Sequence, residues 1–145
     1  MTAALKVSKF RDVVPTTEQM LQHLLMLAAR ALGLSKKHAQ EAAEIGNMRV
    51  DGVQISVSCL ETDAQQDAII VARLAVPCDP AAIRHLLEIN LIAAIAMHST
   101  IAIDCDGQAI LLSLVPISST EPSAFASRIS EMALFANTLE AQLAR

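Results

Sequence analysis

The sequence is poor in glycine and has neither of the common glycine-rich motifs that hold nucleotide phosphates. It contains four glycines in 145 residues, and neither G-x-x-x-x-G-K-[S/T] nor G-x-G-x-x-G occurs. Such loops use closely spaced glycines so that backbone N–H groups can approach the phosphates. The sequence therefore gives no support for nucleotide use.

Basic residues are also scarce. Eleven Lys and Arg stand against 15 Asp and Glu, which gives a net charge of −4 and a pI of about 5.5. Only Lys36-Lys37 places two basic residues side by side. Since binding to phosphate backbones requires clustered Lys and Arg, we expect no nucleic-acid partner.

Cysteine is sparse and irregularly placed. Cys59, Cys78 and Cys105 are widely separated and odd in number, no C-x-x-C occurs, and the four histidines keep no ligand spacing with them. This argues against a disulfide framework or a zinc site, and reduced thiols are typical of a cytosolic protein. We expect no metal and no cofactor.

Long hydrophobic runs are missing as well. The longest uncharged stretch, 89–103, has 15 residues, whereas a spanning helix needs about 20 apolar residues. The first 14 residues contain Lys6, Lys9 and Arg11 but no apolar core of a signal peptide. We therefore expect a cytoplasmic protein without a membrane span.

Catalytic motifs are weak. Asp104-x-Asp106-Gly107 begins like a calcium loop but lacks the later oxygen ligands, so a hairpin turn explains it better. His85 stands near Glu88, and His98-Ser99 are adjacent, yet neither pair has an identifiable third group to orient it. We predict that the chain is not an enzyme and has no catalytic residues.

Apolar residues, by contrast, are abundant. They make up 53% of the chain against 18% charged residues, with a mean hydropathy of +0.43. A soluble monomer of this size could hardly bury so much apolar surface. We expect a large surface for self-association, for a partner, or for both.

The first half of the chain indicates a helix followed by three strands. We expect residues 1–15 to form a loosely ordered arm and residues 16–145 to form a single domain. Thr16 and Gln19 have capping-box spacing before a helix that ends at Gly33. The polar segment 35–43 fits a short helix or an ordered loop. Strands are predicted at 45–50, 53–59 and 68–76, with Asp51-Gly52 as the first hairpin turn.

The second half indicates a helix, two strands and a final helix. Pro80 opens a helix that leads to Asn90 and a loop of small residues, and strands follow at 100–104 and 109–115. The last helix begins near Thr120 or Ser123 and has an apolar seam. The fold class is α+β, with the order α-β-β-β-α-β-β-α and the helices packed on a twisted antiparallel sheet. Strand 109–115 is apolar on both faces, and a second copy of the chain is its simplest outer cover.

Three segments in this second half carry a family resemblance. They are Leu86-Leu87-Glu88-Ile89-Asn90, Asp104-Cys105-Asp106-Gly107 and Val115-Pro116. The chain resembles the type III secretion chaperones of the Tir-chaperone (CesT-like) family, in which Leu-Leu-x-x-Asn often closes the second helix. Two features depart from the family: the stretch after Asn90 lacks glycine, and segment 35–43 is longer and more polar than usual.

The resemblance implies a homodimer that binds an extended segment near the N-terminus of a secreted effector and keeps it export-competent without ATP. It also makes the secretion ATPase a further candidate partner. The candidate client-binding residues are Leu21, Leu25, Met26, Val53, Ile55 and Val57. The candidate dimer-interface residues are Ile83, Leu86, Leu87, Asn90, Leu91, Ile110, Leu112 and Leu114.

Two other classes stay open at this stage. The chain could be a dimeric α+β subunit of a larger assembly, with a permanent partner instead of a releasable client. It could also be a ligand-binding or hydrolytic domain, which would require a deep pocket that places His85 or His98 beside a carboxylate.

Overall fold

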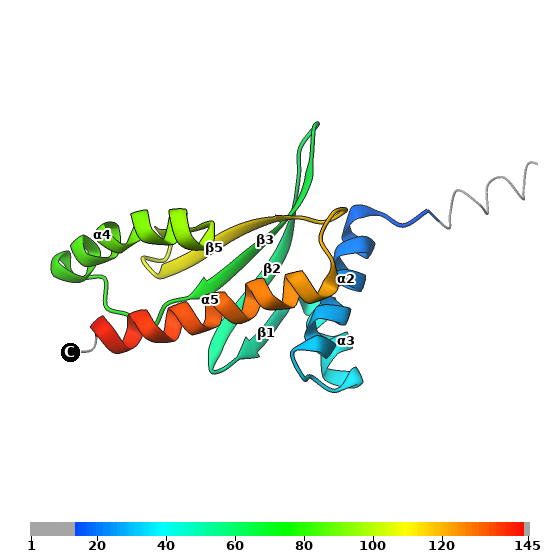
Figure 1. Cartoon of the computed structure of the whole chain (residues 1–145), viewed down its shortest axis with the longest axis horizontal. Helices are drawn as coiled ribbons and strands as arrows, with labels where there is room; N and C mark the ends of the chain where they lie inside the picture. Colours follow the sequence, from blue (N-terminus) through cyan, green and yellow to red (C-terminus); the bar gives the residue numbers. More distant parts are fainter. Residues whose placement is uncertain (1–13, 144–145) are drawn as a thin grey trace, which may run out of the picture.

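A computed structural model describes residues 14–143. Five antiparallel strands form one sheet in the order β1-β2-β3-β5-β4, so β1 and β4 are its edges. Figure 1 shows the long C-terminal helix lying across the sheet, with the first two helices at one end of the molecule and α4 at the other. The predicted arm, residues 1–15, lies outside the described residues except for Val14 and Pro15.

The first described helix, α2 (Thr17–Ala31), begins at the predicted capping box. Thr16 Oγ1 accepts the N–H of Gln19, and Gln19 Oε1 accepts the N–H of Thr16, at 3.2 and 2.9 Å. These two bonds satisfy backbone donors that the helix itself leaves free. Leu21, Leu24 and Leu25 on the inner face are buried.

The segment that the sequence left open is a helix, α3 (Lys36–Ile45). The side chain of Ser35 caps its N-terminus by accepting the N–H of His38 at 3.2 Å. Ala39, Ala42 and Ala43 form a small-residue face that is buried, and α3 packs against α2. The polar remainder of α3 faces solvent, which explains why its apolar periodicity was too weak to detect.

Three strands follow as a meander: β1 (Asn47–Val50), β2 (Val53–Glu61) and β3 (Gln66–Arg73). Asp51 and Gly52 both have positive φ, 51° and 80°, as a two-residue hairpin turn requires. Strand β3 lies two to three residues earlier than predicted. Leu74 and Val76, which were assigned to it, are buried beyond its end.

Helix α4 (Pro80–Met97) corrects the sequence interpretation. We expected it to end near Asn90 and a loop of small residues to follow, but it continues to His98, which adopts φ 51°. The residues after Asn90 are Leu, Ile, Ala and Met, which are compatible with a helix, and no Gly or Pro interrupts them.

The remaining elements are β4 (Ser99–Ile103), β5 (Ala109–Pro116) and α5 (Pro122–Leu143). The β4–β5 turn is the predicted hairpin: Asp104 Oδ1 accepts the N–H groups of Asp106 and Gln108, both at 2.9 Å. The predicted seam of α5 is buried on the sheet, where Phe125, Ile129 and Met132 have no exposed surface. The α+β class is therefore confirmed, with α3 as an addition to the expected order.

Candidate functional site

A groove of about 520 Å³ lies between α2, α3 and β2. Its apolar floor is made by Leu21 and Leu25 from α2 and Val57 from β2. The other residues that line it are Thr16, Thr17, Glu18, Gln22, Ala43, Glu44, Ile45, Gly46, Ser58, Cys59 and Glu61. An apolar floor beneath a polar rim is the usual form of a site that accepts a side chain from another segment.

One glycine fixes the wall that α3 contributes. Gly46 ends α3 with φ 78°, and its carbonyl accepts the N–H of Val57 at 2.8 Å. A Cβ at this position would lie 2.7 Å from the carbonyl oxygen of Val57. The end of α3 is therefore bonded directly to the strand that forms the groove floor, at a distance only glycine permits.

The charged residues that line the groove are all acidic. Glu18 comes from the first turn of α2, Glu44 from the end of α3, and Glu61 from the end of β2. Glu61 Oε1 also accepts from Thr17 Oγ1 and Gln66 Nε2, both at 3.1 Å. The lining contains no Lys, Arg or His. Burial, and then Glu61 and Glu18, raise the pKa of the Cys59 thiol on the same wall.

The predicted client-binding residues divide between this groove and the core. Leu21, Leu25 and Val57 line the groove, and Met26 is half-buried on α2. Ile55 has no exposed surface and Val53 has 3%, so contact with a client would require opening of the core there. The assignment of all six stays a prediction.

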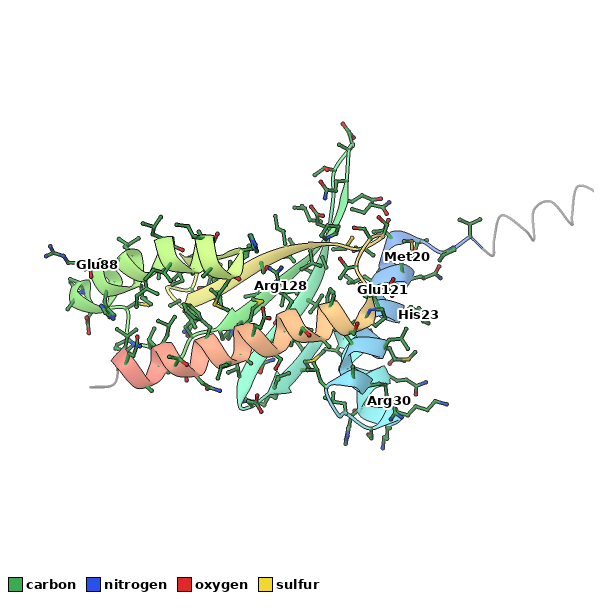
Figure 2. All side chains as sticks on the ribbon, in the orientation of Figure 1. Met20, His23, Arg30, Glu88, Glu121 and Arg128 are labelled. Atoms are coloured by element: carbon green, nitrogen blue, oxygen red, sulfur yellow. The ribbon has the colours of Figure 1, made fainter. Side chains whose placement is uncertain are left out.

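A second surface is the outer side of α4. It exposes large apolar side chains along its C-terminal part: Leu87, Leu91, Ile92 and Ile95 are 60–71% exposed. Figure 2 marks this helix by Glu88, at the end of the molecule opposite Met20 and His23 of α2. An exposed apolar patch of this kind marks an interaction surface.

By length and composition alone, α4 could cross a membrane, and 17% of it is buried. The absence of a membrane span stays a prediction. Polar contacts hold the helix to the domain, since Asn90 Oδ1 accepts the N–H of Ile101 on edge strand β4 at 2.7 Å. Arg84 and Glu88 form an exposed pair 3.9 Å apart on the same helix.

The predicted dimer residues also fall into distinct environments. On α4, Leu87 and Leu91 are exposed, Ile83 and Asn90 are half-buried, and Leu86 belongs to the core. On β5, Ile110, Leu112 and Leu114 share the face opposite α5. Leu114 is 47% exposed there, and the other two are half-buried. Whether a second copy covers them stays a prediction.

Several residues of both surfaces were missed from the sequence. Glu18, Glu44 and Glu61 come from three separate elements, so no local pattern joins them. Ile45, 70% exposed on the groove wall, was assigned to a strand. Ile92 and Ile95 were assigned to a loop, and a helical interpretation of 91–97 would have placed them beside Leu91.

The two histidines considered for catalysis, His85 on α4 and His98 at its C-terminal end, both lie outside the groove. His85 Nδ1 lies 4.0 Å from Glu88 Oε2 on the partly exposed surface of α4, and His98 ends that helix. Within residues 14–143, no three His, Cys, Asp or Glu side chains gather as metal ligands would.

Comparisons with known proteins agree with this geometry. The family model of the Tir chaperone protein (CesT) family matches residues 21–140. No curated protein matches the sequence. Among solved structures, the Yersinia pestis type III secretion chaperone SycH in complex with a YscM2 fragment has 21% identity and a TM-score of 0.60. That match covers 82% of this chain and 98% of the other.

Two further structures are similar. The HopA1–SchA chaperone–effector complex has a chain with 14% identity and a TM-score of 0.65, covering 88% of this chain and 98% of that one. The ExoU–SpcU complex from the type III secretion system of Pseudomonas aeruginosa has a chain with 16% identity and a TM-score of 0.55, covering 81% and 94%. These likenesses establish the fold, and the family model spans most of the chain. The protein therefore belongs to the Tir chaperone (CesT) family.

Proposed function

We propose that the protein is a type III secretion chaperone that binds an extended segment near the N-terminus of a secreted effector. It acts in the cytoplasm and keeps that segment soluble and competent for export. The observation that carries the proposal is the groove between α2, α3 and β2, present in a member of a chaperone family. Binding of this kind needs neither a catalytic residue nor a cofactor.

The groove suits an extended client for a physical reason. An extended segment projects alternate side chains to opposite sides, so one set can enter the apolar floor while the other remains in water. The floor residues Leu21, Leu25 and Val57 offer that apolar contact. Ordering a segment that is disordered when free costs conformational entropy, and burial of apolar surface offsets that cost.

The proposal includes a homodimer formed through α4 and the outer face of β5. The exposed residues Leu87, Leu91 and Ile95 support it, because they would be costly to leave in water on a single copy. The groove is lined by α2, α3 and β2, and Figure 1 shows α2 and α3 at the other end of the molecule from α4. A dimer joined through α4 would therefore leave the groove of each copy open. The secretion ATPase stays a candidate partner of the loaded complex.

The test is an affinity pull-down of the full chain from its source cells under secretion-active conditions. Limited proteolysis and mass spectrometry then identify what co-purifies. We expect a larger protein with a protected stretch of tens of residues near its N-terminus. An empty pull-down from cells shown to secrete would contradict the proposal.

Two matched variants connect the result to the groove. Ile45→Asp places a charge on the groove wall at a residue that is 70% exposed, so the fold should tolerate it. Leu134→Asp makes the same change on α5 at a residue that is 68% exposed and outside the groove. We expect the first variant to lose the client at least tenfold and the second to retain it. Equal recovery by both would place the client elsewhere.

A further inference from the structure

The groove is acidic on three sides, and nothing among the residues that line it balances this charge. Glu18, Glu44 and Glu61 surround an apolar floor, and no basic side chain lines it. A segment that carries both apolar and basic side chains would complement this surface. Its apolar side chains would contact the floor, and the three carboxylates would attract its basic side chains and repel an acidic segment.

The chain itself contains such a segment directly before the groove. Residues 5–11, LKVSKFR, hold three apolar and three basic side chains and no acidic one. They include three of the 11 Lys and Arg of the whole chain. Phe10 is the largest apolar side chain among them and one of only three phenylalanines.

The attachment point allows this segment to reach the groove. Thr16 and Thr17 line the groove at the start of α2. The floor along α2 extends to Leu25, about 12 Å further at 1.5 Å per helical residue. Residues 12–15 provide a link of up to about 13 Å, and seven extended residues span about 23 Å. A segment that turns back at the link can therefore cover the whole floor.

We propose that residues 5–11 of the chain bind in its own groove, with Phe10 on the apolar floor and the basic side chains among the three glutamates. A link of only four residues would hold the segment at an effective concentration on the order of millimolar, so even weak contacts would fill the groove. The segment would then compete with any incoming client. Only this competition rests on the proposed chaperone function; binding of the segment does not.

The test uses tryptophan as a unique reporter, because the sequence contains no Trp and no Tyr. The full chain is prepared as Phe10→Trp, and a matched control carries Thr2→Trp outside residues 5–11. Acrylamide quenching is measured without any client. A neutral quencher is needed because the acidic groove would repel iodide. We expect Trp at position 10 to be quenched at least threefold less efficiently than Trp at position 2, independently of protein concentration.

Charge reversal then connects the protection to the groove. Glu18→Lys with Glu44→Lys in the Phe10→Trp chain should restore efficient quenching. Glu41→Lys with Glu131→Lys, at exposed positions outside the groove, changes the net charge equally and should leave the protection intact. If the groove variant does not fold, Lys6→Glu with Lys9→Glu and Arg11→Glu alters only the segment and should have the same effect.

The proposal is overturned if Trp at positions 10 and 2 is quenched equally. It is also overturned if protection survives the charge reversals that fold, since the segment would then lie elsewhere. Protection that disappears on dilution would indicate binding to a neighbouring copy and would overturn the intramolecular arrangement. None of these outcomes depends on a client, so they are distinct from failure of the chaperone proposal.

Discussion

Gly46, on the wall of the candidate groove, leaves no room for a side chain. Its φ of 78° disfavours any side chain, and a Cβ would meet the Val57 carbonyl oxygen at 2.7 Å. Gly33 also has a positive φ, 96°, but has open space around it. Substitution at Gly33 therefore measures the cost of the backbone conformation alone, and substitution at Gly46 adds the cost of the contact with Val57.

We predict that Gly46→Ala lowers the free energy of unfolding by more than about 2 kcal/mol, and Gly33→Ala by about 1 kcal/mol. Urea unfolding of both variants, followed by circular dichroism, measures the difference. Equal losses would show that the backbone near Val57 relaxes without cost.

Cys59 provides a second prediction at this scale. Burial, with Glu61 and Glu18 nearby, raises the pKa of its thiol, so less thiolate is present at a given pH than for an ordinary cysteine. In single-cysteine variants, we expect iodoacetamide to alkylate Cys59 several-fold more slowly than the exposed Cys105 at pH 8. The alkylation rate of Cys59 should reach half its maximum above the ordinary thiol pKa.

Replacement of both carboxylates, Glu18→Gln with Glu61→Gln, removes the two charges but not the burial. The pKa of Cys59 should therefore fall only in part, and the rate at pH 8 should rise. A rate that does not respond to these changes would leave burial as the sole cause.

At the scale of elements, Arg128 links the last helix to two others. Its guanidinium on α5 donates to Ser113 Oγ on β5 at 2.9 Å and to the Met97 carbonyl at the end of α4 at 3.2 Å. A cation at a helix C-terminus also interacts favourably with the helix dipole. Figure 2 labels Arg128 on α5, where this helix crosses the sheet.

We predict that Arg128→Met destabilises the protein by about 1–3 kcal/mol, because the buried Ser113 hydroxyl and the Met97 carbonyl each lose a donor. Thermal unfolding measures this, with Arg84→Met as the control on the exposed surface of α4, where about 0.5 kcal/mol or less is expected. Equal losses of stability in Arg128→Met and Arg84→Met would contradict the proposed role of Arg128 in linking α5 to α4 and β5.

The sequence predicted elements well where a local pattern fixed them. The capping box at Thr16, the Asp51-Gly52 turn and the alternation that starts at Val53 all depend on residues close in the chain, and all three are confirmed. The predicted end of α4 was wrong. The helix ends at His98, which adopts a left-handed conformation, and no glycine there marks the end in the sequence. The acidic groove could not be predicted, since positions 18, 44 and 61 meet only in the folded chain.

At the scale of the whole molecule, several of the large apolar side chains that stay exposed on one copy gather on two surfaces. Leu87, Leu91, Ile92 and Ile95 lie on α4, and Leu114 lies on the outer face of β5. Burial of a Leu or Ile side chain contributes about 1.5–3 kcal/mol relative to exposure. A second copy that covers both surfaces would gain several such contributions.

We predict that Leu91→Asp and Leu114→Asp each convert a dimer into a monomer with the fold intact, since both side chains are exposed on one copy. Analytical ultracentrifugation across a concentration series measures the mass, and circular dichroism verifies the fold. Leu134→Asp on α5 is the control and should stay dimeric. A wild-type protein that is monomeric, or variants with unchanged mass, would contradict this interface.

The bond between Gly46 and Val57 has a consequence for how such a groove can diverge. Because the backbone fixes the distance between α3 and the sheet, neighbouring wall residues such as Glu44 and Ile45 can be exchanged without changing the width of the groove. Mutation can then alter charge and shape along the wall while the scaffold stays constant. Related chains that keep this glycine could therefore acquire different binding preferences through few substitutions, with little loss of stability.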